Sequence, residues 1–107
     1  MVADLKALTG FPPQAVRRLI VKVGSALLVA PEGSVRRAWL ESLVTEIAAR
    51  KAAGQQIVIV SSGAIALGAR RLALPKGGRA TLEDAQAAAA VGQIALSQVW
   101  ADLLGTH

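Results

Sequence analysis

The stretch Gln56-Ile57-Val58-Ile59-Val60-Ser61-Ser62-Gly63-Ala64 decides the class of fold. β-Branched residues dominate positions 57–60, which is typical of a strand, and Ser61-Ser62-Gly63 ends it. Four consecutive apolar residues without alternation indicate a strand buried on both faces, as in a parallel sheet. The sequence therefore predicts a parallel α/β sheet, with a helix over residues 64–72 directly after this strand.

A second strand is predicted earlier in the chain, over Arg18-Leu19-Ile20-Val21-Lys22-Val23, and Gly24 ends it. After a connection over residues 25–33, apolar residues recur at helical spacing over residues 35–53. Ser34 is the expected N-cap of this helix and Gly54 its C-terminal glycine. Two strands joined through a helix imply a parallel, right-handed βαβ unit.

The last third of the chain is predicted to be a loop over residues 74–80 and one long Ala-rich helix. Thr81-Leu82-Glu83-Asp84 approximates a capping box at its start, and Gly105 can end it. Two strands make a thin sheet, since sheets usually have about 5–6 strands. We therefore expect residues 18–107 to be the N-terminal part of a larger α/β domain, and residues 1–17 to be a leader outside the core.

Composition excludes several classes of protein. The 107 residues are 53% hydrophobic and 18% charged, which suits one domain with an aliphatic core. The absence of cysteine excludes a disulfide scaffold, a cysteine zinc site, an iron–sulfur cluster and a thiol nucleophile, and fits a cytoplasmic protein. His107 is the single histidine, which excludes a serine–histidine–aspartate triad and a histidine-rich metal site. No metal ligand is predicted.

The chain is basic, with a formal net charge of +5 at pH 7. Its densest basic cluster, Arg70, Arg71, Lys76 and Arg79, has no interleaved aromatic residue, so we interpret it as a solvated surface and not as a nucleic-acid site. No apolar run approaches the roughly 20 residues of a membrane span. We therefore expect neither nucleic acid nor a membrane as a partner.

Two polar segments, Lys22-Val23-Gly24-Ser25 and Ser61-Ser62-Gly63-Ala64, follow the predicted strands. The carboxyl ends of adjacent parallel strands meet at one sheet edge, where ligands of open α/β sheets bind. A lysine beside a glycine turn can hold phosphate, and a helix N-terminus attracts an anion. The residues alone leave plainer alternatives open: Lys22 simply points outward from its strand, and Ser61 or Ser62 only caps the next helix.

Three stretches, in this order, resemble the N-terminal part of the glutamate 5-kinase family, within the amino-acid kinase superfamily. They are residues 19–25 with Leu27-Leu28, residues 58–66 with Gly68, and residues 86–93. The resemblance implies a three-layer αβα sandwich around a mostly parallel sheet. It also implies transfer of the γ-phosphoryl group of ATP, with Mg²⁺, to the side-chain carboxylate of L-glutamate. The product, L-glutamyl 5-phosphate, opens proline biosynthesis; such enzymes are cytoplasmic homo-oligomers, commonly inhibited by proline.

Carried over position by position, the resemblance makes Lys22 the catalytic contact to the transferring phosphoryl group. Gly24 and Ser25 would belong to the turn that binds ATP phosphate. Ser62 would bind glutamate, with backbone N–H groups of Gly63 and Ala64 beside it. The chain departs from the family in length, because the nucleotide-binding half has no counterpart. We therefore expect the 107-residue chain alone to be inactive and to expose apolar surface.

Three other functions are also compatible with the sequence. One is another amino-acid kinase, acting on acetylglutamate, aspartate or a nucleoside monophosphate, against which the 61–64 segment argues. Another is a non-catalytic, kinase-derived fragment that pairs with a partner chain. The last is a small basic nucleic-acid binder, which only the net charge favours and which would show steep salt dependence.

Overall fold

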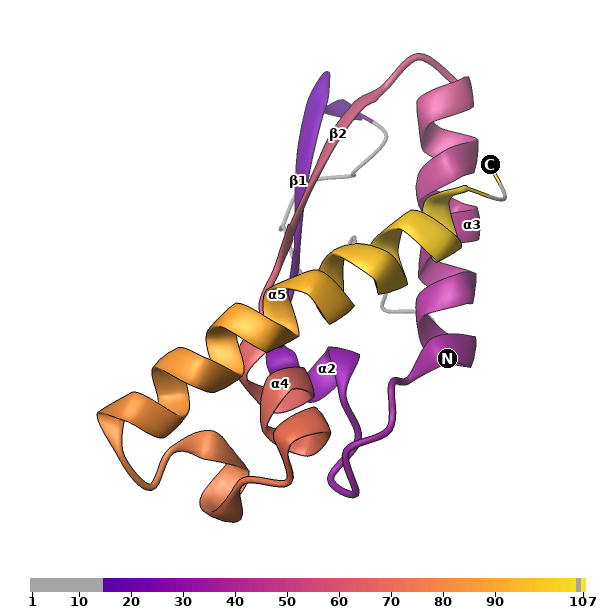
Figure 1. Cartoon of the computed structure of the whole chain (residues 1–107). Helices are drawn as coiled ribbons and strands as arrows, with labels where there is room; N and C mark the ends of the chain where they lie inside the picture. The colour runs from indigo at the N-terminus through magenta and orange to yellow at the C-terminus, as the bar shows by residue number, and fades with distance from the viewer. Residues whose placement is uncertain (1–14, 106) are drawn as a thin grey trace.

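The computed structural model describes residues 15–105 and residue 107 (Figure 1). Its elements, in chain order, are β1 (Arg18–Val23), α2 (Ser25–Leu28), α3 (Arg37–Ala52), β2 (Gln56–Ser61), α4 (Ala64–Leu72), the 3₁₀ helix η2 (Pro75–Gly78) and α5 (Leu82–Leu104). Both predicted strands, the helix over 64–72 and the long helix after Thr81 are confirmed. The predicted connection over 25–33 contains the short helix α2, and the predicted loop over 74–80 contains η2. The predicted leader lies mostly outside the described residues.

The two strands pair in parallel, as predicted, with Leu19 beside Ile57 and Val23 beside Ser61. The chain passes from β1 to β2 through α2 and α3, because parallel neighbours require a crossover connection. Helices α3 and α5 lie on the same side of the sheet (Figure 1). The core between them and the sheet consists of aliphatic side chains from β1, α3 and α5: Leu19, Val21, Val23, Leu40, Leu43, Val44, Ile47, Leu96, Val99 and Leu103.

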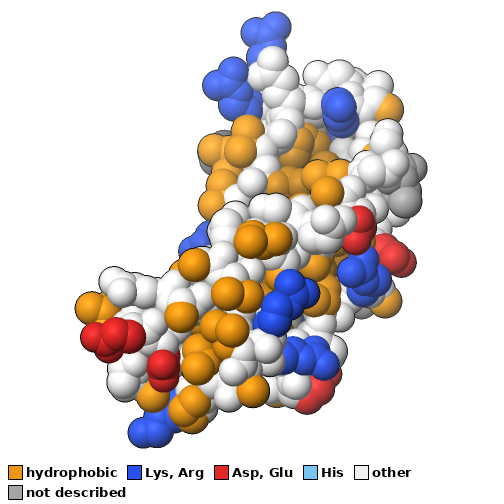
Figure 2. Space-filling model, in the orientation of Figure 1, with side chains coloured by type: hydrophobic (Ala, Val, Ile, Leu, Met, Phe, Trp, Pro, Cys, Tyr) orange, Lys and Arg blue, Asp and Glu red, His pale blue; other side chains and the backbone are white. Residues whose placement is uncertain are grey.

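The other face of the sheet is exposed. Ile20 is 64% exposed, Val58 47% and Val60 49%. The prediction that β2 is buried on both faces is therefore wrong for this chain, because within the described residues the helices cover only one face. Figure 2 shows apolar side chains on the surface beside the strands and along α4 and α5. The two layers match the N-terminal part of an α/β sandwich.

The start of α3 differs from the prediction. The helix begins at Arg37, after the N-cap residue Arg36, and Ser34 does not cap it. Val35 instead forms an isolated antiparallel bridge with Val29, which holds it in extended backbone. The Ser34 hydroxyl donates to the carboxylate of Glu32. This hydrogen bond, followed by smaller effects that include attraction by Arg36 and Arg70, lowers the pKa of Glu32.

The end of α3 agrees with the prediction. Gly54 follows the C-cap residue Ala53 with a φ of +99°, a backbone conformation that glycine adopts at low cost. Gly54 N–H donates to the Lys51 carbonyl at 3.0 Å, and Gln55 N–H donates to the Arg50 carbonyl at 3.1 Å. These two bonds form a Schellman motif, which satisfies carbonyl groups that the helix end leaves free.

Helices α4 and α5 cross at very short distance. A Cβ atom added to Gly92 would lie 1.6 Å from the Ala64 carbonyl oxygen, and one added to Gly68 would lie 1.8 Å from the Ala88 carbonyl oxygen. Gly92 and Gly68 therefore permit close packing of the two helices. Because both glycines sit at the crossing, each helix backbone contacts the other directly, and this contact fixes the position of α4 on the fold.

Helix α5 begins as predicted, since the Thr81 hydroxyl accepts a hydrogen bond from Asp84 N–H at 3.0 Å. By length and composition, α5 is apolar enough to cross a membrane. One such helix is weak support for a membrane span, because the core helix of a soluble protein passes the same test. Here the buried positions Ala88, Gly92, Leu96, Val99 and Leu103 place one side of α5 against the rest of the fold.

Candidate functional site at the carboxyl ends of the strands

The two polar turns meet, as the parallel topology predicts. Val23 and Ser61 are register partners at the last position of each strand. Ser62 N–H donates to the Val23 carbonyl at 2.9 Å, so the pairing extends one residue into the second turn. Residues 22–25, the first turn, and residues 62–64, the second turn, therefore lie at one edge of the sheet.

The first turn presents an exposed cation and an open backbone. Lys22 is exposed and lies beside Val60, on the face of the sheet that no helix covers within residues 15–105. Gly24 has extended backbone, with φ −72° and ψ 162°, and a Cβ added there would have no atom within 4 Å. Ser25 is exposed. Space at Gly24 beside a free ammonium group leaves room for an anion to approach the backbone.

The second turn depends on Gly63. Its φ of +120° lies in the left-handed region, and a Cβ added there would lie 2.3 Å from Leu28 Cδ2. Gly63 is the N-cap residue of α4, so the chain can turn sharply from β2 into the helix. Ser62 is exposed, whereas the Ser61 hydroxyl donates to the Ser62 carbonyl at 3.0 Å. The exposed hydroxyl of Ser62 thus stands beside the N-terminus of α4.

Leu28 and Arg36, neither of which was predicted as a site residue, support this edge. Leu28 is completely buried and packs against Gly63, so it joins the first turn, through α2, to the second. Arg36 donates from Nε to the Ala26 carbonyl at 3.0 Å and from its backbone N–H to the Leu28 carbonyl at 2.9 Å. The sequence carries no local signal for either role, because both contacts join residues that tertiary structure brings together.

The described residues at this edge include groups that could bind an anion but no cluster of side chains that could ligate a metal ion. They contain no group of three or more histidine, cysteine, aspartate or glutamate side chains that could hold a metal. Gln93, which falls in one of the stretches behind the resemblance, is exposed, and its amide lies 3.5 Å from the Ser97 hydroxyl. It does not belong to either turn.

Residues 17–107 match the amino acid kinase family. The match includes β1, β2 and both turns, and it covers most of the chain. The chain belongs to the amino acid kinase family.

Particular relatives within this family are glutamate 5-kinases. The chain is 72% identical over 97 residues to the glutamate 5-kinase of Sphingopyxis alaskensis, which is 91% of this chain and 26% of that protein. It is 64% identical over 95 residues to the glutamate 5-kinase of Zymomonas mobilis, 89% of this chain and 24% of that protein. The resemblance found in the sequence is confirmed. The chain spans about a quarter of the length of these relatives.

Proposed function

We propose that this chain provides the phosphate-binding and glutamate-binding edge of a glutamate 5-kinase. The observation that carries the proposal is the junction of the two turns, with Ser62 N–H bonded to the Val23 carbonyl at 2.9 Å. This junction lies in a chain that is 72% identical to a glutamate 5-kinase. The reaction is transfer of the γ-phosphoryl group of ATP to the side-chain carboxylate of L-glutamate, the first step of proline biosynthesis.

In the proposed reaction, a glutamate carboxylate oxygen bonds to the γ-phosphorus as the bond from that phosphorus to the β,γ-bridging oxygen breaks, and ADP leaves. Phosphoryl transfer depends mainly on positioning and on neutralisation of charge. Lys22 is the catalytic residue, whose ammonium group offsets charge on the transferring phosphoryl group. Gly24 and Ser25 offer backbone donors to ATP phosphate. The Ser62 hydroxyl and the N–H groups of Gly63 and Ala64 hold glutamate.

ATP supplies the phosphoryl group in this proposal, and Mg²⁺ accompanies ATP. The first turn suits an anion, since Gly24 leaves open space and Lys22 is exposed. The described residues lack a cluster of acidic side chains, so we assign no metal ligand to this part of the chain. Inhibition by proline, assembly into a homo-oligomer and a cytoplasmic location belong to the same proposal. We expect neither nucleic acid nor a membrane as a partner.

A chimera tests the proposal. In it, this chain replaces the matching 97 residues of the Sphingopyxis alaskensis glutamate 5-kinase. Hydroxylamine traps glutamyl phosphate as a hydroxamate, so ATP-dependent hydroxamate formation measures the reaction. We expect the chimera to be active on L-glutamate and the 107-residue chain alone to be inactive. A folded chimera that phosphorylates aspartate or acetylglutamate, and not glutamate, would support another amino-acid kinase instead.

A further inference from the structure

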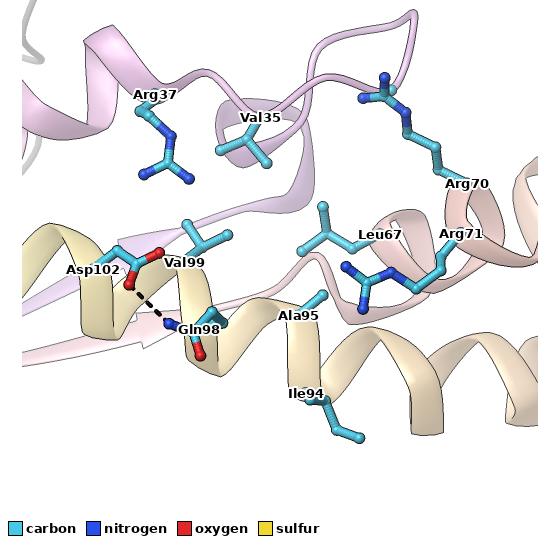
Figure 3. A pocket seen from close by; sticks show the side chains of 11 residues that line it. Val35, Arg37, Leu67, Arg70, Arg71, Ile94, Ala95, Gln98, Val99 and Asp102 are labelled. Atoms are coloured by element: carbon cyan, nitrogen blue, oxygen red, sulfur yellow. Dashed lines mark hydrogen bonds between the residues drawn. The ribbon is translucent and has the colours of Figure 1, made fainter.

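A cavity of about 620 Å³ lies between α4, α5 and the segment that precedes α3 (Figure 3). Its volume falls in the range of small-molecule sites, which are mostly apolar with a few convergent polar groups. Leu67 of α4 contributes to its apolar lining, together with Ile94 and Val99 of α5. None of the residues of the two turns lines it, so it is separate from the site described above.

The charged side chains of the cavity are unbalanced. Three guanidinium groups line it, from Arg37, Arg70 and Arg71, against the single carboxylate of Asp102. Arg70 has a neighbouring counter-charge in Glu32, which leaves Arg37 and Arg71. Asp102, which accepts a hydrogen bond from the neutral Gln98 amide at 2.8 Å, supplies one negative charge against these two positive charges. The cavity therefore carries excess positive charge above an apolar lining.

The two remaining arginines line the cavity from different elements. Figure 3 shows the Arg37 guanidinium group, from the start of α3, near Val99 and Asp102, and the Arg71 guanidinium group, from the last turn of α4, near Ala95. Among the described residues the only ion pair is Arg50 with Glu46, so neither Arg37 nor Arg71 has one. Two unpaired guanidinium groups that line a common cavity are suited to a shared anion, since each offers several N–H donors in one plane.

We propose that this cavity binds a small organic anion: a carboxylate or phosphate group attached to a compact apolar body. The anionic group lies between Arg37 and Arg71, in charge-assisted hydrogen bonds to their guanidinium groups. The apolar body contacts Leu67, Ile94 and Val99, of which only Ile94 has much exposed surface to remove from water. This site is independent of the proposed kinase reaction, because it shares no residue with the two turns.

Nuclear magnetic resonance titration of the ¹⁵N-labelled full chain tests this site. The probes are phenylacetate and phenyl phosphate, which combine an apolar ring with a carboxylate or a phosphate. Phenylacetamide, the neutral isostere, and inorganic phosphate, which has no apolar body, are the controls. We expect at least one anionic probe to shift amide resonances in residues 67–71 and 94–102, with a Kd at least tenfold lower than either control. The two probes distinguish a carboxylate ligand from a phosphate ligand.

Variants inside and outside the cavity distinguish binding of the anion in the cavity from general attraction of an anion to a basic protein. Arg37→Gln and Arg71→Gln should each weaken binding of the anionic probe about tenfold or more. Lys51→Gln removes one exposed cation of α3 outside the cavity and should change the Kd less than twofold. Both arginines are exposed, so the variants should keep the circular dichroism spectrum of the parent chain.

Three results would overturn the proposal. Equal binding of phenylacetamide and phenylacetate, together with no preference for phenyl phosphate, would show that charge plays no part. An equal loss in Lys51→Gln and Arg71→Gln would show attraction by net charge alone. Shifts of the same resonances with protein concentration, without any probe, would show that a second copy of the chain covers the cavity.

Discussion

Gly63 combines two local constraints, a φ of +120° and contact with the buried side chain of Leu28. Gly63→Ala should therefore destabilise the chain by about 2–4 kcal/mol, from the left-handed backbone and from overpacking. Urea unfolding measures this change. Gly24→Ala is the matched control, because Gly24 has negative φ and open space around it. Its free energy of unfolding should rise by about 0.4–1 kcal/mol or stay unchanged. An equal loss in both variants would contradict the packing described for Gly63.

A substitution at a single residue, Lys22, tests the proposed chemistry of the first turn. Lys22 is exposed on the sheet face that none of the described helices covers, so Lys22→Gln should change the free energy of unfolding by less than about 0.5 kcal/mol. In the active chimera, the same variant should lower kcat for hydroxamate formation by about 10²–10³-fold, because it removes a charge aimed at the transferring group. Lys51→Gln is the control and should leave kcat unchanged. A chimera that keeps full activity without Lys22 would exclude this catalytic role.

Among the contacts between secondary-structure elements, the crossing of α4 and α5 fixes the position of α4 on the fold. Gly92→Ala should gain about 1 kcal/mol of helix propensity, but its Cβ would lie 1.6 Å from the Ala64 carbonyl oxygen. The clash outweighs the gain, so we expect a net loss of about 2 kcal/mol or more, measured by urea unfolding. The exposed Ala90→Gly reports propensity alone and should cost about 1 kcal/mol. A more stable Gly92→Ala variant would contradict the crossing.

The N-cap of α5 provides a second test of how the helices are stabilised. The Thr81 hydroxyl accepts from Asp84 N–H, and Thr81→Ala should cost about 1 kcal/mol of stability by removing this cap. Thr45→Ala is the control, since Thr45 is exposed within α3 and its hydroxyl donates only to the Glu41 carbonyl. It should change the free energy of unfolding by less than about 0.5 kcal/mol. Equal effects in thermal unfolding of the two variants would show that Thr81 does not cap the helix.

The bounds of the strands and helices show which parts of the fold could be predicted from the sequence and which could not. The bounds of β1, β2 and α4 follow from local apolar patterns and glycine breakers, which act within a few residues. The start of α3 does not, because Val35 pairs with Val29 and this contact overrides a local capping signal. The edge that joins both turns was predictable from parallel topology, whereas Leu28 and Arg36 act through tertiary contacts that leave no sequence motif.

The residues that the structure describes leave one sheet face without cover, and the chain spans about a quarter of the length of its relatives. Exposed apolar side chains at Ile20, Val58 and Val60 should cause self-association of the chain. Sedimentation velocity should show the weight-average mass rising with concentration, and Val58→Thr with Val60→Thr should reduce that rise. Leu82→Thr, an exposed apolar position on α5, is the control and should not reduce it. A monomer at every concentration would contradict this expectation.

In the proposed site, the second turn holds glutamate at the edge where it meets the first turn. The most direct measurement is the KM for L-glutamate in hydroxamate formation by the chimera, with Ser62→Ala compared with Ser61→Ala. Ser62 is exposed at the edge, whereas the Ser61 hydroxyl bonds the backbone. We predict that Ser62→Ala raises the KM for glutamate at least tenfold with the KM for ATP unchanged, and that Ser61→Ala changes the KM for glutamate less than threefold. An unchanged KM for glutamate in Ser62→Ala would contradict the proposed role of Ser62 in holding glutamate.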